Sequence, residues 1–431
     1  MNHIRKWLFG NEKYAMRNSY IWDFAYSIEY SLQSAILMLI ITRISGPYES
    51  GIFLIAYTVT QLTTAIGNYG LRSFQVSDVR KEYSFRTYFA SRIVTIVLMI
   101  IATALYSASQ GYDRKRIILI IILCAYRIVE CVEDVFHAEM QKKMRLDIAS
   151  KIAAIKIFVS TIAFAVVFYM SKSLVLASIV LLMVAVVISL LLTMVASGEF
   201  EEISLKAEWN NIPKLLWVCL PVCAGAFLYN YLVNAPKYAI DRNLSEEMQT
   251  IFNILFMPIF AINMLSVFIF KPLIAKMGVM WNEKNKKTFV LYMFRQILVI
   301  IGITIAVVIG GVLIGLDVLG WMYGVVLSEY RLLFACLLIF GGFAALVSYL
   351  VVLLTIVRKQ SSIMVAYGIA MILDIIFIDG LVVRYGIWGA GMSYGLSMGI
   401  VLIILTSVLV ATVIGGKRFR TKTLKERREN E

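Results

Sequence analysis

Apolar residues occur along the chain in about twelve continuous stretches, each roughly twenty residues long and separated by short polar joints. An α-helix rises 1.5 Å per residue, so about twenty apolar residues cross the ~30 Å hydrocarbon core of a bilayer. Backbone polar groups must be bonded within such a segment, which makes each stretch a predicted helix. The predicted spans are residues 20–41, 51–70, 87–107, 117–135, 152–170, 173–195, 215–235, 251–273, 289–313, 332–357, 363–383 and 388–413.

Composition supports a membrane protein and excludes several other classes. Of the 431 residues, 60% are hydrophobic and 16% charged, whereas a soluble domain carries about 25% charged residues. The net charge of +14 comes without the soluble basic face that a nucleic-acid interface requires. Only His3 and His137 are present as histidines, and all five cysteines fall inside predicted spans, so we predict no metal site.

The distribution of lysine and arginine predicts the orientation. Short cytoplasmic joints retain positive charge, and one set of joints is much the richer in it. That set comprises residues 1–17, 71–86, 142–145, 274–287, 358–359 and the tail after residue 413. Arg114, Lys115 and Arg116 lie on the opposite side and are outnumbered. We therefore expect both termini in the cytoplasm and a chain that crosses the membrane many times.

A charged joint over residues 197–214 divides the spans into two sets of six. The predicted lobes are 1–200 and 201–431, the second ending in the basic tail. Because six is even, both lobes enter the membrane in the same direction, as in transporters built from parallel repeats. Prolines gather in the seventh and eighth spans, and Pro221, Pro236 and Pro258 are candidate hinges, although a proline kink can also be static.

The fourth span carries a polar stripe. Its residues recur at spacings of three and four, which places them on one helical face: Arg127, Glu130, Asp134, His137 and Gln141, with Glu133 beside them. Ionisable side chains are costly in hydrocarbon and normally face a protein interior or a wet cavity. Two interpretations stay open, an interhelical salt-bridge seam and the lining of a cavity that binds cargo or a coupling ion.

Further polar residues interrupt other spans. The candidates for substrate binding are Arg92, Arg127, Lys156, Asn234, Lys237, Lys271 and Arg295. Arginine and lysine stabilise phosphate oxygens, so such a set favours an anionic cargo such as a pyrophosphate, unless the cations pair with acids instead. The candidates for coupling to Na⁺ or H⁺ are Glu29, Glu130, Asp134 and Asp374. A carrier driven by consumption of its product on the far side needs no coupling ion and no cofactor.

Several strings resemble those of Wzx-type polysaccharide transporters, the O-antigen and capsule repeat-unit flippases of the MOP superfamily. The two most specific strings cover residues 234–241 (NAPKYAID) and 133–147, which ends in QKKMRLD. Shorter ones are residues 70–75, 256–258 and 386–391. The resemblance extends over essentially the whole chain.

This resemblance implies an all-α monomer of two six-helix bundles around a central cavity, working by alternating access. The implied cargo is an undecaprenyl-diphosphate-linked oligosaccharide repeat unit, moved from the inner to the outer leaflet of the bacterial cytoplasmic (inner) membrane. The implied partners are that glycan, membrane lipids, a polysaccharide polymerase and a chain-length regulator. It does not identify the glycan or its pathway.

Three other classes fit the sequence less well. A multidrug or cation antiporter of the same architecture favours an acidic or apolar pocket, whereas the intramembrane residues here lean basic. A membrane enzyme, such as a glycan polymerase or acyltransferase, needs acids and bases on long outer loops, and the outer joints here are short. A scaffold does not require so many buried charges. The sequence favours a transporter over an enzyme.

Overall fold

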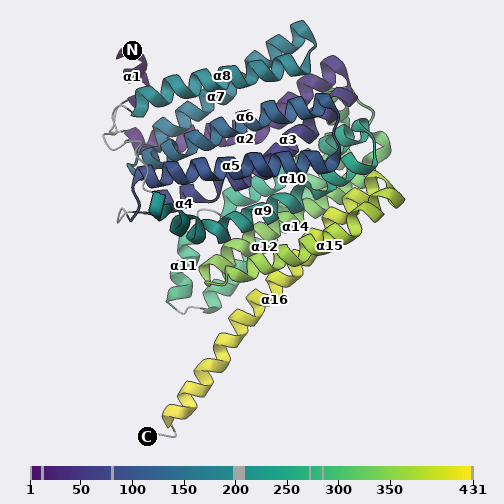
Figure 1. Ribbon diagram of the computed structural model, residues 1–431. Helices are drawn as coiled ribbons and strands as arrows, with labels where there is room; N and C mark the ends of the chain where they lie inside the picture. The colour runs from purple at the N-terminus through teal and green to yellow at the C-terminus, as the bar shows by residue number, and fades with distance from the viewer. Residues whose placement is uncertain are drawn as a thin grey trace. The chain divides into compact units, whose positions relative to one another are not determined.

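The computed structural model describes residues 2–10, 14–78, 82–197, 209–270, 273–283 and 286–428, and every regular element within them is helical. The long helices are α2 (Ala15–Ser45), α3 (Pro47–Asn68), α5 (Phe85–Gln110), α6 (Arg114–Lys142), α7 (Leu146–Ser171), α8 (Leu174–Ser197), α9 (Ile212–Asn243), α10 (Glu246–Phe270), α12 (Lys286–Gly310), α14 (Arg331–Ile356), α15 (Ser361–Tyr385) and α16 (Ile387–Arg428) (Figure 1). The short helices are α1 (Asn2–Phe9), α4 (Leu71–Ser77), α11 (Ile274–Asn282) and α13 (Leu316–Tyr323).

The predicted all-helical membrane fold is confirmed. In the described part of the chain, eleven helical segments are long and apolar enough to cross a bilayer. The remaining long helix is α6, whose 29 residues suffice in length but carry more charged side chains than the other eleven segments allow, because of the polar stripe. Each predicted span coincides with one long helix to within a few residues of its ends, or lies inside a longer one.

Several helices extend beyond the predicted spans. The seventh span is predicted over residues 215–235, whereas α9 has 32 residues, because polar residues outside the hydrocarbon core continue the backbone hydrogen bonding. The ninth span continues from α12 through a π-helical turn at Gly311–Gly315 into α13. Hydropathy instead predicts an outer joint after residue 313. The short helices α1, α4 and α11 are not predicted, since hydropathy over a twenty-residue window cannot register them.

A left-handed turn positions α4. Tyr69 (φ 49°) ends α3, and Gly70 (φ 69°) begins α4 directly after it. A Cβ on Gly70 would lie 2.6 Å from Val222 Cγ1, so both the backbone conformation and the close packing favour glycine there. The turn lays α4 against α6 and carries Arg72 to the polar stripe of that helix.

The chain forms two compact units. The first comprises Met1–Asn230 together with Ser245–Thr250, and the second comprises Tyr231–Leu244 and Ile251–Glu431. In the first unit, α7 packs on both α2 and α8, while α6 packs on α3, α5 and α8. In the second unit, α16 packs on α14 and α15, and α12 packs on α14. The predicted lobe boundary at residues 200 and 201 lies outside the described residues and stays a prediction.

The first turn of α10 is tightly packed within the first unit. The Thr250 hydroxyl donates to the Pro47 carbonyl at 2.6 Å, and Arg116 pairs with Glu246. Gly51 lies directly against the Glu246 carbonyl, since a Cβ built on Gly51 would sit 2.2 Å from that oxygen. Only glycine allows this approach, because the obstacle is backbone and cannot rotate away.

Replacing Gly51 by alanine is therefore expected to destabilise the protein by about 1–3 kcal/mol, the usual cost of overpacking. The matched control is Gly302→Ala on α12, where nothing lies within 4 Å of the added Cβ. There the gain in helix propensity is expected to hold or raise stability by about 0.5–1 kcal/mol. Apparent melting temperatures in detergent measure both, and equal melting of Gly51→Ala and wild type would contradict the packing described.

Candidate functional site

The polar stripe of α6 gathers partners from several helices of the first unit. Asp134 accepts from Arg72 of α4 at 2.8 Å and from Arg92 of α5 at 2.6 Å. Arg92 is fully buried and also donates to the Gly67 carbonyl at 2.7 Å. Arg72 reaches Gln141 as well, at 2.9 Å. Asp134 is thus held between two guanidinium groups, which offset the cost of burying the carboxylate.

A second ion pair lies deeper in the same unit. Lys156 of α7 pairs with Glu133 of α6, and both side chains are almost completely buried. The Ser189 hydroxyl of α8 donates to the other carboxylate oxygen of Glu133. The Lys156 amine also lies 5.9 Å from the centre of the Tyr126 ring. This cluster joins three helices, and both oxygens of the carboxylate are satisfied.

Arg127 leaves a terminal amino group of its guanidinium without a partner among the described residues, whereas Arg92 leaves only its Nε so. One amino group donates to Glu130 at 2.6 Å, and the guanidinium stacks on the Tyr57 ring at 4.5 Å. The side chain is 1% exposed, yet its Nη2 has no hydrogen-bond partner among the described residues. Buried donors are rarely left unpaired, so this nitrogen marks a place where a further acceptor can bind.

In the second unit, Lys237 of α9 is a buried cation of the predicted set. It is 7% exposed, and its amine lies 5.2 Å from the Phe256 ring centre and 5.9 Å from that of Phe260. No carboxylate of the described residues pairs with it. Asn234 is buried one turn earlier on the same helix. Aromatic faces attract a cation but do not neutralise it. The positive charge of Lys237 therefore has no compensating negative charge among the described residues.

Asp374 of α15 is a buried acid with one carboxylate oxygen that lacks a hydrogen-bond partner among the described residues. Its Oδ1 accepts from the hydroxyls of Ser393 and, at 3.0 Å, Ser397, both on α16. Its Oδ2 has no hydrogen-bond partner among the described residues, although the side chain is 5% exposed. All three residues line a cavity of about 570 Å³ that also includes Arg384. Sequence reasoning does not single out the two serines; their spacing of four on an apolar helix is the signal that could have found them.

The other predicted residues are placed as follows. Arg295 is exposed on α12, and Lys271 lies outside the described residues. Glu29 of α2 is half-buried, with one buried carboxylate oxygen that lacks a partner in the described part of the chain. Helix α9 continues through Pro221 and Pro236, and α10 continues through Pro258. Their role as hinges stays a prediction.

No protein-family model matches the chain, and no curated protein sequence matches it. Solved structures do match it. The lipid II flippase MurJ, in an inward closed conformation, shares 12% identity over 91% of this chain and 89% of its own, with a TM-score of 0.70. A multidrug resistance MATE transporter in an inward-facing conformation shares 12% sequence identity. The match covers 90% of this chain and 96% of the transporter, with a TM-score of 0.63.

A third match is a MOP superfamily transporter from Pyrococcus furiosus, described as having a binding pocket of reverse polarity. It shares 14% identity over 95% of this chain and 98% of its own, with a TM-score of 0.56. Identities this low establish the fold and nothing finer. The chain therefore has the helical membrane fold of the MOP superfamily transporters, as its sequence strings indicated.

The ion pair of Lys156 and Glu133 gives a direct test of the site's energetics. Lys156→Met leaves a buried carboxylate without its cation, which costs about 3–5 kcal/mol. Adding Glu133→Gln removes the orphaned charge and is expected to restore most of the lost stability. The control is Arg331→Met, which breaks an exposed pair with Asp317 and should cost about 1 kcal/mol or less. If Lys156→Met and Arg331→Met had the same melting temperature, the description of Lys156 and Glu133 as a buried, coupled ion pair would be refuted.

Proposed function

We propose that the protein is a flippase that moves an undecaprenyl-diphosphate-linked oligosaccharide repeat unit from the inner to the outer leaflet of the cytoplasmic membrane. It acts by alternating access, without an enzymatic step, and supplies a surface polysaccharide such as O-antigen or capsule. The one observation that carries this proposal is Lys237, a buried amine that has aromatic neighbours and no paired carboxylate among the described residues. A diphosphate supplies the negative charge that this amine lacks.

Arg127 is the second residue assigned to the cargo. Its free Nη2 can donate to a phosphate or sugar oxygen while its other amino group stays on Glu130. Arg92 and Lys156, in contrast, are engaged by Asp134 and Glu133, and we assign them to holding the helices together. Four of the six predicted cations are described and buried. Lys237 has no paired carboxylate among the described residues, Arg127 pairs with Glu130 but keeps Nη2 open, and the other two pair with Asp134 and Glu133.

The fold likeness supports a lipid-linked cargo. The structure with the TM-score of 0.70 is named a lipid II flippase, and lipid II is itself a lipid-linked glycan. The sequence strings around residues 133–147 and 234–241 favour the Wzx-type branch of the superfamily. Its members act on the same chemical class, with a diphosphate between lipid and sugar. We keep the predicted orientation, with both termini in the cytoplasm, and a monomer working beside a polymerase and chain-length regulator.

Asp374 is the acid best suited to couple transport to Na⁺ or H⁺. Glu130 and Asp134 already face arginines, which leaves them little affinity for a cation. Asp374 keeps one free oxygen, and its neutral serine partners allow either protonation or cation binding. Glu29 is the other candidate, with one buried oxygen free of partners within the described ranges.

A cation or drug antiporter is the second candidate function. The free carboxylate oxygen of Asp374 lines a cavity, and the MATE transporter likeness belongs to that class. An antiporter uses such an acid to bind its cationic substrate, whereas the flippase uses it only for the coupling ion. Efflux of a fluorescent cation by the purified protein, with no movement of the glycan lipid, would select the antiporter.

Lys237→Ala is expected to slow translocation of a fluorescent undecaprenyl-diphosphate oligosaccharide in proteoliposomes by at least tenfold, since one charge-assisted contact contributes about 1.5–3 kcal/mol. Lys237→Arg keeps the charge and should retain most of the rate. The matched control is Lys214→Ala, an exposed lysine on the same helix. If Lys237→Ala flipped the lipid at the wild-type rate, Lys237 would not be a cargo-binding residue. If the wild-type protein did not flip the lipid at all, the proposed cargo would be rejected.

The role of Asp374 is tested by imposed ion gradients. Wild-type translocation is expected to accelerate under either a proton or a sodium gradient, and Asp374→Asn should keep the basal rate while losing that acceleration. The control is Asp317→Asn, an exposed acid in the same unit. A gradient response that survives in Asp374→Asn would exclude this residue from coupling.

A further inference from the structure

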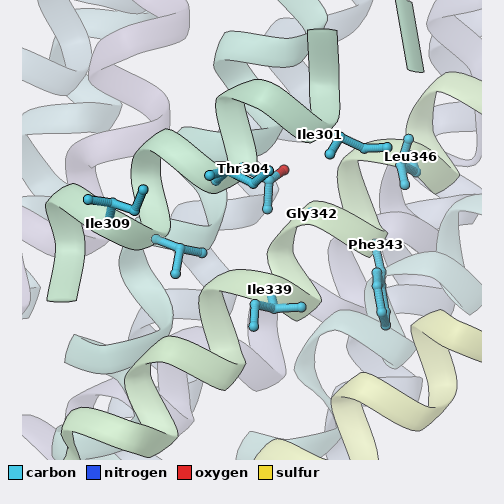
Figure 2. Close-up of a pocket in the computed structure, with 9 residues that line it drawn as sticks. Ile301, Thr304, Ile309, Ile339, Gly342, Phe343 and Leu346 are labelled. Carbon is cyan, nitrogen blue, oxygen red and sulfur yellow. The ribbon is translucent and has the colours of Figure 1, made fainter. Parts of the chain in front are cut away.

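An apolar groove runs between α12 and α14 on the outside of the second unit. The two helices approach closely at one point, where a Cβ on Gly342 would lie 2.5 Å from Thr304 Cγ2. The groove has a volume of about 310 Å³ (Figure 2). Its lining residues are Ile301, Thr304, Ile305, Val308, Ile309, Ile339, Gly342, Phe343 and Leu346.

The walls of this groove fit a hydrocarbon chain. Thr304 carries the one side-chain hydroxyl among the lining residues, and that hydroxyl donates to the Ile300 carbonyl at 2.8 Å within its own helix. No polar side chain of the lining is therefore left to bind a sugar or a phosphate. Ile301, Ile305 and Ile309 are exposed along one edge, so the groove opens outward from this unit.

A basic cluster lies toward the beginning of α12. The Lys276 amine of α11 is 2.8 Å from the Tyr292 hydroxyl and 4.7 Å from the centre of that ring. Arg295, one turn further along α12, interacts electrostatically with the same tyrosine. Lys276 and Arg295 are both exposed, and neither forms an ion pair with any residue that the structure describes. Two cations without a paired carboxylate among the described residues, beside a tyrosine hydroxyl, suit a phosphate group.

The basic cluster and the groove are connected along one helix face. Arg295, Leu298, Gly302, Ile305 and Ile309 follow one another at spacings of three and four, which form a single stripe. From Arg295 to Ile309 is fourteen residues, or about 21 Å at 1.5 Å per residue. One leaflet contributes about half of the ~30 Å hydrocarbon core, to which a headgroup adds several ångströms. The stripe therefore has the length of one lipid in one leaflet.

We propose that this surface binds one anionic phospholipid, with its phosphate at Lys276 and Arg295 and an acyl chain in the groove between α12 and α14. The lipid belongs to the leaflet nearest the α11 end of α12. An undecaprenyl chain is much longer than the groove, so the occupant is a phospholipid and not the carrier of the cargo. This lipid fills the space between two helices of the second unit and makes their packing dependent on membrane composition.

The test reconstitutes the full chain in vesicles of equal phosphatidylglycerol and phosphatidylcholine, extracts it in mild detergent, and counts retained lipids by native mass spectrometry. We expect about one phosphatidylglycerol per chain and a preference of at least tenfold over phosphatidylcholine. The double variant Lys276→Ala/Arg295→Ala should lose that preference. Ile305→Trp should block the groove and remove the retained lipid while the cations remain.

Two matched controls separate this site from general effects. Lys214→Ala removes an exposed cation elsewhere, and Ile372→Trp adds bulk at an exposed position of α15, away from the stripe and the groove. Both should retain the lipid as the wild type does. Equal retention of the two phospholipids, or equal losses in variants and controls, would overturn the site. Displacement of phosphatidylglycerol by added undecaprenyl phosphate at equal concentration would overturn the choice of occupant.

Discussion

The structure of the first unit depends on how it compensates ionisable groups within a membrane. A charge in hydrocarbon costs several kcal/mol unless an opposite charge and hydrogen bonds accompany it. Helix α6 carries more such groups than any other predicted span, and its acids are met by cations from α4, α5 and α7. Those contacts fix how four helices rotate about their axes, because a small rotation would separate a charge from its partner.

The same requirement divides structural charges from charges available for function. Where an acid and a base meet in the protein, as Glu133 and Lys156 do, the pair has little remaining affinity for a solute. Where a group is buried without a full set of partners, other packing has met its desolvation cost, and the proposed function assigns it an incoming partner. Lys237, the free nitrogen of Arg127 and the free oxygen of Asp374 belong to this second kind. Two attract anions and one attracts cations, which suits a carrier that moves an anionic lipid together with an ion.

The sequence predicts the helices better than it predicts the partners of their polar residues. Span positions follow from hydropathy, and spacing alone places Arg127, Glu130 and Asp134 on one face of α6. Which helix supplies each counter-charge depends on tertiary packing, so the pairing of Lys156 with Glu133 is not predictable from the chain. Ser393 and Ser397 are missed because serine is common in membrane helices. The turn at Tyr69 and Gly70 is missed because its left-handed geometry leaves no hydropathy signal.

The position of the first turn of α10 has a consequence for biosynthesis. Gly51 packs against Glu246, which the ribosome adds 195 residues later (246 − 51). At 5–20 residues per second, the interval is about 10–40 s. Throughout that time the beginning of α3 presents Ser50, Gly51 and the Pro47 carbonyl without their final neighbours. This end of α3 therefore reaches its final packing only after α10 has been synthesised, however early α3 itself forms.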